Sequence, residues 1–88
     1  MRLDLFLKVS RLVPRRPLAR DMCDAGAVEV NGLRAKSARA IQAGDVISIR
    51  QRGRLTRVRV LEVPARQLSK AQAATVYETI SVERYETD

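Results

Sequence analysis

The dipeptide Asn31-Gly32, set between two runs of alternating residues, is the feature that most constrains the fold. Residues 27–30 (Ala-Val-Glu-Val) precede it and residues 33–36 (Leu-Arg-Ala-Lys) follow it. Both central residues of a type I′ turn need a positive φ, which Asn and Gly adopt readily. The pattern therefore predicts a β-hairpin with a two-residue loop. An antiparallel sheet is therefore expected from about residue 28 onward.

A first helix is predicted ahead of this hairpin, over residues 4–13. Its apolar side chains recur at the i, i+3, i+4 spacing of a buried helix face, beginning with Leu3, Phe6 and Leu7. Pro14 is expected to end it.

A second helix is predicted to begin at Pro17, because proline suits the first helical turn. No Ser or Thr is present there to cap the helix. We therefore expect its first turn to be less firmly held, with water or another side chain in place of the cap. Gly26 fits a left-handed C-terminal cap, and the apolar residues at helical spacing are Leu18, Met22 and Ala25. The single cysteine, Cys23, is interpreted as a small buried hydrophobe.

Beyond the hairpin, strands are predicted over residues 46–50 and 55–63, after a linker or single helical turn at 37–43. Ser69 and Gln72 have the spacing of a capping box, which predicts a short helix reaching Tyr77. Residues 81–88 are expected to be a frayed end. The order α-α-β-β-β-β-α gives an α+β fold, divided into residues 1–66 and a C-terminal segment, 67–88, made of the short helix and a flexible acidic tail.

The composition excludes several common classes of catalytic and metal site. Eighty-eight residues bury only about 60–65% of their unfolded surface and support one core. The chain has no histidine and one cysteine, so it lacks a Ser-His or Cys-His pair and the ligands of an ordinary zinc site. We expect no catalytic residue, no metal and no cofactor. The unpaired cysteine suits a reducing cytoplasm, and no apolar run is long enough to span a membrane.

The net charge of +7 is unevenly distributed. Residues 1–66 carry fifteen cations and six anions, whereas residues 67–88 carry two cations and four anions. Fourteen of the seventeen cations are arginine, the residue best suited to gripping phosphate with two hydrogen bonds. Five cations near the N-terminus follow helical spacing and form a predicted stripe: Lys8, Arg11, Arg15, Arg16 and Arg20. No local acid is expected to neutralise Arg15 and Arg16.

Such a stripe matches the backbone of a nucleic-acid helix. Only three aromatic residues are present, so a base-stacking platform for single strands is not expected, and recognition of folded RNA by its backbone and shape fits best. Three alternatives stay open: a solvated helix face, a helix-turn-helix DNA-binding regulator formed by residues 1–25, and a polybasic membrane-surface protein, which the well-patterned core disfavours.

Several short motifs together resemble the S4 RNA-binding domain. They are Arg2-Leu3-Asp4, Ser10-Arg11-Leu12, the run from Gly26 to Gly32 (Gly-Ala-Val-Glu-Val-Asn-Gly), and Gly44-Asp45. The resemblance implies the S4 (alpha-L) fold, with two N-terminal helices packed on a small, mostly antiparallel sheet.

Over nearly its whole length the chain is similar to the small stand-alone S4 proteins of the RqcP (YabO-like) family, and it is related to the ribosome-associated heat-shock S4 proteins. This resemblance implies a monomer that docks on the large ribosomal subunit and contacts 23S rRNA and peptidyl-tRNA during ribosome quality control. A separate factor would supply the charged tRNA for C-terminal tailing. Subunit recycling, the heat-shock response and ribosome assembly remain alternative roles. S4 modules are also fused to enzymes, but these 88 residues are not expected to supply a catalytic domain.

Carried over by position, the RNA-facing residues implied by the family are Arg2, Lys8, Arg11, Arg15 and Arg16. Arg20 extends the stripe, and three further candidates follow the hairpin turn: Arg34, Lys36 and Arg39. Asp4 is expected to be structural, stabilising the first helix by its negative charge near the N-terminus.

Overall fold

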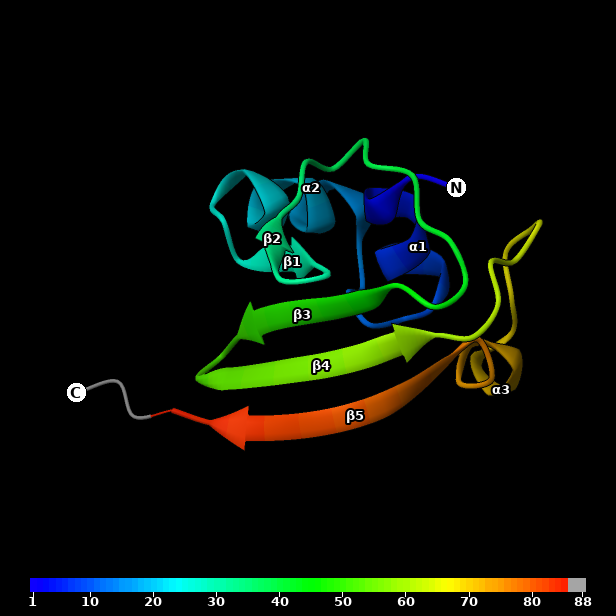
Figure 1. Cartoon of the computed structure of the whole chain (residues 1–88). Coiled ribbons are helices and arrows are strands. Elements are labelled where there is room, and N and C mark those ends of the chain that lie inside the picture. Colours follow the sequence, from blue (N-terminus) through cyan, green and yellow to red (C-terminus); the bar gives the residue numbers. More distant parts are fainter. Residues whose placement is uncertain (86–88) are drawn as a thin grey trace.

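A computed structural model describes residues 1–85 (Figure 1). Its first helix, α1 (Leu3–Val9), is shorter than the predicted 4–13. The Ser10 hydroxyl donates to the Leu7 carbonyl at 3.2 Å, and Arg11 has a φ of 62°. This left-handed residue cannot continue a right-handed helix, so α1 ends before Pro14.

The second helix, α2 (Arg16–Asp24), has Pro17 in its first turn, as predicted. Arg15 is its N-cap and makes no side-chain capping hydrogen bond, so no side chain takes the place of the missing Ser or Thr. Gly26 has the expected positive φ of 78°. The buried face consists of Ala19, Met22 and Cys23, so the prediction that Leu18 and Ala25 belong to the apolar face is wrong.

Cys23 is buried, as predicted, with 2% of its surface exposed. Burial raises the pKa of its thiol, and the negative charges of Asp4 and Asp24 raise it further. A thiol held in its neutral form is a poor nucleophile, so Cys23 serves packing.

The five strands form one antiparallel sheet in the order β2-β1-β3-β4-β5. The predicted hairpin joins β1 (Val28–Val30) to β2 (Leu33–Arg34), with positive φ at both Asn31 (53°) and Gly32 (83°). Strands β3 (Val46–Gln51) and β4 (Arg54–Val60) follow as a second hairpin. The α+β prediction, with two helices on a mostly antiparallel sheet, is confirmed.

The core lies between the two helices and the inner face of the sheet. In Figure 1 the helices lie beside β1–β3, and β4 and β5 continue the sheet away from them. The fully buried side chains of the core come from both helices, the connection between them, β1, β3 and β4, and include Leu3, Phe6, Leu7, Val13, Ala19, Val28, Val30, Ile47, Val58 and Val60. Within residues 1–85, no helix is long and apolar enough to cross a membrane.

The C-terminal segment differs most from the prediction. The capping box is present, since Ser69 Oγ accepts from the Gln72 N–H at 3.2 Å, but α3 is only Lys70–Ala73. The chain then forms β5 (Tyr77–Arg84), which pairs with β4 along its length. The predicted frayed end is therefore wrong for 81–84, because backbone hydrogen bonds to β4 order them. Residues 86–88 of the predicted tail lie outside the described residues.

Candidate nucleic-acid interface

A buried carboxylate, Asp4, lies at the centre of the basic N-terminal surface. Its side chain is fully buried, and its Oδ1 accepts hydrogen bonds from Arg2 Nε at 3.2 Å and from the Leu5 N–H at 2.8 Å. Its Oδ2 accepts from Arg16 Nε at 3.3 Å and Arg20 Nε at 3.0 Å. Three guanidinium groups thus converge on one carboxylate; we call Arg2, Arg16 and Arg20 the arginine array.

The array keeps Asp4 ionised. Burial raises the pKa of this carboxyl, but the hydrogen bonds from Arg20, Arg16 and the Leu5 N–H, together with the charge of Arg16, outweigh burial and lower the pKa below its usual value of 3.8. A buried carboxylate is stable only where such donors surround it. At neutral pH the four side chains therefore carry a fixed net charge of +2.

The array leaves donors free for a ligand. Arg16 and Arg20 bind Asp4 through Nε, and none of their Nη groups donates a hydrogen bond to any residue among 1–85. The side chains of Arg2, Arg16 and Arg20 remain 47%, 33% and 50% exposed. A guanidinium with its Nε edge anchored and its Nη edge exposed can grip a phosphate through two parallel hydrogen bonds.

The fold fixes the array from two sides. The N-terminus is held against the loop at 35–41, where the Leu3 N–H donates to the Arg39 carbonyl at 2.7 Å and the Ile41 N–H donates to the Met1 carbonyl at 2.9 Å. Arg16 and Arg20 lie one turn apart on α2, which packs against α1. Arginines from the N-terminus and from α2 meet only because these two helices pack together.

Other predicted residues lie around the array without joining it. Lys8 and Arg11 line a surface pocket at the end of α1, and Arg15 is exposed at the N-cap of α2. The predicted stripe is divided among three parts of the chain: Lys8 lies on α1, Arg11 and Arg15 lie between the helices, and only Arg16 and Arg20 share α2.

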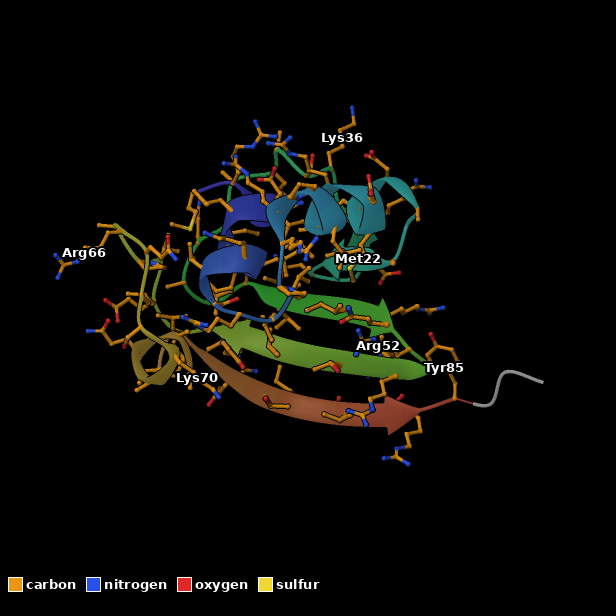
Figure 2. The ribbon with its side chains drawn as sticks, turned by 180° about the vertical axis from the view of Figure 1, so that it is seen from behind. Met22, Lys36, Arg52, Arg66, Lys70 and Tyr85 are labelled. Atoms are coloured by element: carbon orange, nitrogen blue, oxygen red, sulfur yellow. The ribbon has the colours of Figure 1, made fainter. Side chains whose placement is uncertain are left out.

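The three candidates that follow the hairpin turn occupy different places. Arg34 donates a hydrogen bond to the Asp24 carbonyl and so ties β2 to the end of α2. Lys36 and Arg39 are exposed on the loop that holds the N-terminus, and Figure 2 shows Lys36 projecting from that side of the molecule. Lys36 and Arg39 are thus free to bind an anion, whereas Arg34 has a structural partner.

Sequence reasoning missed the part played by Asp4. We expected no acid to neutralise Arg16, yet Asp4, twelve residues earlier, lies 3.3 Å from its Nε. Asp4 has a structural role, as predicted, and it lies in the first turn of α1. It also fixes three arginines, which was not predicted. The i, i+4 spacing of Arg16 and Arg20 was the available clue, since it puts both on one face of α2.

Two arginines of β4 are arranged differently. Arg59 pairs with Glu78 at 2.7 Å and Arg57 with Glu83 at 3.4 Å, each joining β4 to β5. One carboxylate per guanidinium neutralises these cations, whereas three guanidinium groups share Asp4. Arg57 and Arg59 are therefore less available to a polyanion than the three arginines that share Asp4.

Comparison with known proteins agrees with this architecture. Residues 1–47 match the S4 domain. The chain is 43% identical to the "RQC P-site tRNA stabilizing factor" of Streptococcus pneumoniae, over 98% of this chain and 97% of that protein. It is 44% identical to the protein of the same name from Halalkalibacterium halodurans, over 89% of this chain and 88% of that one. These names do not describe enzymes.

A solved structure is also similar. The trimeric structure of Vibrio cholerae Heat Shock Protein 15 superposes with a TM-score of 0.86 at 28% identity, covering 92% of this chain and 82% of that one. The backbone that carries the two N-terminal helices and the Asn-Gly hairpin is therefore shared with this heat-shock protein. The chain belongs to the S4-domain family, together with small relatives named RQC P-site tRNA stabilizing factors.

Proposed function

We propose that this protein binds the large ribosomal subunit and its P-site tRNA in ribosome quality control, gripping RNA phosphates with the arginine array. The observation that carries the proposal is the cluster at Asp4, where one buried carboxylate holds three arginines with their outer edges exposed. The protein acts as a non-catalytic clamp in the cytoplasm. Lys8, Arg11, Arg15, Lys36 and Arg39 extend its contact surface.

The chemistry of the array favours a structured RNA backbone. Guanidinium groups fixed in a common arrangement match phosphates that are themselves held at fixed spacing, as in a stem. Among the described aromatic residues, Phe6 is fully buried in the core and Tyr77 packs against it. Tyr85 is exposed, but it lies beside the β3–β4 turn, where its N–H donates to the Gly53 carbonyl, so the array has no aromatic ring beside it on which bases can stack. Recognition by the array therefore depends on shape and phosphate position.

The relatives support the choice of partner. Proteins that align over nearly the whole chain are named for stabilising P-site tRNA, so the same partner is assigned to this protein. We further propose contacts with 23S rRNA and cooperation with a separate factor that supplies charged tRNA for tailing.

Co-sedimentation with purified large subunits tests this proposal. Subunits that carry a P-site peptidyl-tRNA are expected to bind the protein at least about tenfold more tightly than vacant subunits, because tRNA adds phosphate contacts worth about 1.4 kcal/mol or more. Affinity should fall steeply between 50 and about 200 mM salt. Equal affinity for the two kinds of subunit would contradict the proposed role.

A second candidate is a role in subunit recycling or the heat-shock response. The structural similarity to Vibrio cholerae Heat Shock Protein 15 favours it. This candidate shares the RNA-binding surface, and binding to vacant subunits as tight as to subunits with P-site tRNA would support it over quality control.

A further inference from the structure

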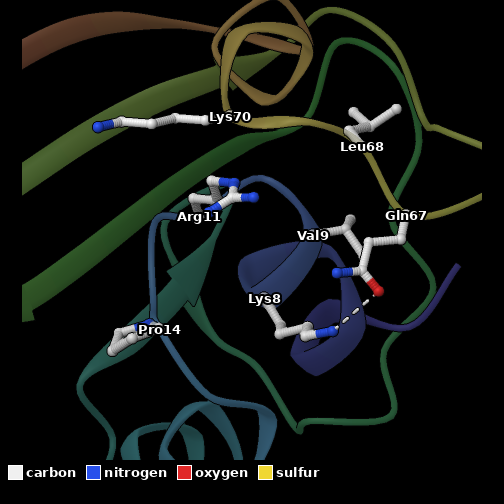
Figure 3. Close-up of a pocket in the computed structure, with 7 residues that line it drawn as sticks. All are labelled: Lys8, Val9, Arg11, Pro14, Gln67, Leu68 and Lys70. Carbon is white, nitrogen blue, oxygen red and sulfur yellow. Dashed lines mark hydrogen bonds between the residues drawn. The ribbon is translucent and has the colours of Figure 1, made fainter.

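A surface pocket of about 430 Å³ lies between the end of α1 and the segment that leads into α3 (Figure 3). One wall comes from α1 and the turn after it, and the other from residues 67–70. The lining residues are Lys8, Val9, Arg11, Pro14, Gln67, Leu68 and Lys70. Its volume is in the range of pockets that hold small ligands, about 300–1,000 Å³.

The lining has the chemistry of a nucleotide site. Three of its side chains are cations (Lys8, Arg11 and Lys70), and none of its lining residues is acidic. Val9, Pro14 and Leu68 supply apolar surface for a flat ring. The Gln67 amide offers both a donor and an acceptor, which suits the edge of a base.

Arg11 occupies a strained position in this wall. Its φ of 62° is uncommon for a residue with a side chain, and such conformations are concentrated at ligand sites. It places an arginine between the end of α1 and Pro14, where it lines the hollow. No described residue gives its guanidinium an ion-pair partner within 4.0 Å or a hydrogen bond, so the charge is available to a ligand.

The pocket continues the arginine array. Asp4 and Lys8 are four residues apart on α1, so the two side chains lie on the same side of the helix, one turn apart. Lys8 Nζ now donates to Gln67 Oε1 at the long distance of 3.4 Å. A phosphate oxygen would be a better partner for this amine, because it carries charge.

We propose that this pocket holds one unpaired nucleotide of the bound RNA. Lys8, Arg11 and Lys70 bind its phosphate, the base packs against Leu68 and Pro14, and Gln67 meets the base edge. This inference rests on the proposed function and deepens it. It assigns a role to the segment at 67–70, which lies beyond the S4-matched residues 1–47.

An NMR titration of the full-length protein with adenosine and cytidine 5′-monophosphate tests the site. The backbone amide signals of residues 8–11 and 67–70 should shift with a dissociation constant in the millimolar range. Lys70→Gln should weaken this binding about fivefold to tenfold through loss of one charged contact. Arg66→Gln is the matched control: it removes the same charge from an exposed residue of the same segment that does not line the pocket, and it should change the constant less than twofold.

Other outcomes overturn the proposal. If no signal in these two segments shifts, the pocket does not bind nucleotides. If inorganic phosphate or an acidic peptide binds as tightly as the nucleotides, the base contributes nothing and the assignment to RNA is wrong. The titration does not involve ribosomes, so it can fail while large-subunit binding persists, and large-subunit binding can fail while the titration succeeds.

Discussion

The Asp4→Asn variant should bind the large subunit at least about tenfold more weakly than the wild type, although the substitution raises the net charge by one. Asp4 holds Arg16 and Arg20 through Nε and Arg2 through Nε and Nη2. A neutral amide cannot hold three guanidinium groups by charge-assisted hydrogen bonds. The arginines would gain rotamer freedom and repel one another, so binding would have to order them at a cost of about 0.5–1.5 kcal/mol for each side chain. A purely electrostatic account predicts the opposite sign.

The matched control for this variant is Asp21→Asn. Asp21 is exposed on α2 next to Arg20, so its replacement changes net charge equally without touching the array. The affinity of the Asp21→Asn variant for the large subunit should be unchanged or slightly higher than that of the wild type. Loss of charged hydrogen bonds should lower the free energy of unfolding of Asp4→Asn by about 2 kcal/mol, or its Tm by roughly 8–16 °C. The two affinities are therefore compared at a temperature where circular dichroism shows both variants folded. Equal affinities for the two variants would show that the array needs no anchor.

The Arg16→Gln variant should lose about tenfold to 100-fold in affinity for the large subunit. Arg16 is the least exposed arginine of the array, and its Nη groups are free for a phosphate. Loss of a charge-assisted hydrogen bond to a phosphate costs about 1.5–3 kcal/mol. The slope of log affinity against log salt should also fall by about one phosphate contact. Binding assays at several salt concentrations measure both effects.

Arg84→Gln serves as the control for Arg16→Gln, because it removes one exposed positive charge from β5, away from the array. Equal losses in the two variants would mean that binding depends on diffuse charge. Charge reversal at position 16 is a poorer test, since it would put a second carboxylate beside the buried Asp4 and destabilise the fold.

The elements predicted correctly are those whose determinants lie within a few residues. Asn31 and Gly32 adopt the positive φ values that a type I′ turn requires, and Ser69 and Gln72 form their reciprocal cap, because each motif is a local contact. Helix ends were harder to predict. The stop at Val9 depends on a left-handed arginine, which has no recognisable sequence signal.

The parts that could not be predicted depend on tertiary contacts. The array joins residue 2 to residue 20 through one carboxylate, which needs the packing of α1 against α2. Strand β5 was missed because none of its side chains is buried, so it lacks the one-sided alternation of a half-buried strand. Its β-branched residues, including Thr79, Ile80 and Val82, were the signal that was passed over.

A buried carboxylate surrounded by arginines is costly to desolvate, and an apolar core residue would serve stability equally well. Its presence here fits the proposed function, because Asp4 sets the direction of three cations before RNA arrives. Prior ordering of this kind lowers the entropic cost of binding. On this account, the positions of the cations decide affinity more than the net charge of +7 does.

A cryo-electron microscopy map of the protein on a large subunit with P-site peptidyl-tRNA tests the central claim most directly. We expect RNA phosphates at about 2.7–2.9 Å from the Nη atoms of Arg16 and Arg20, with Asp4 still bound to both Nε atoms. A map in which RNA contacts the β4–β5 surface, while Arg2, Arg16 and Arg20 face solvent, would contradict the account.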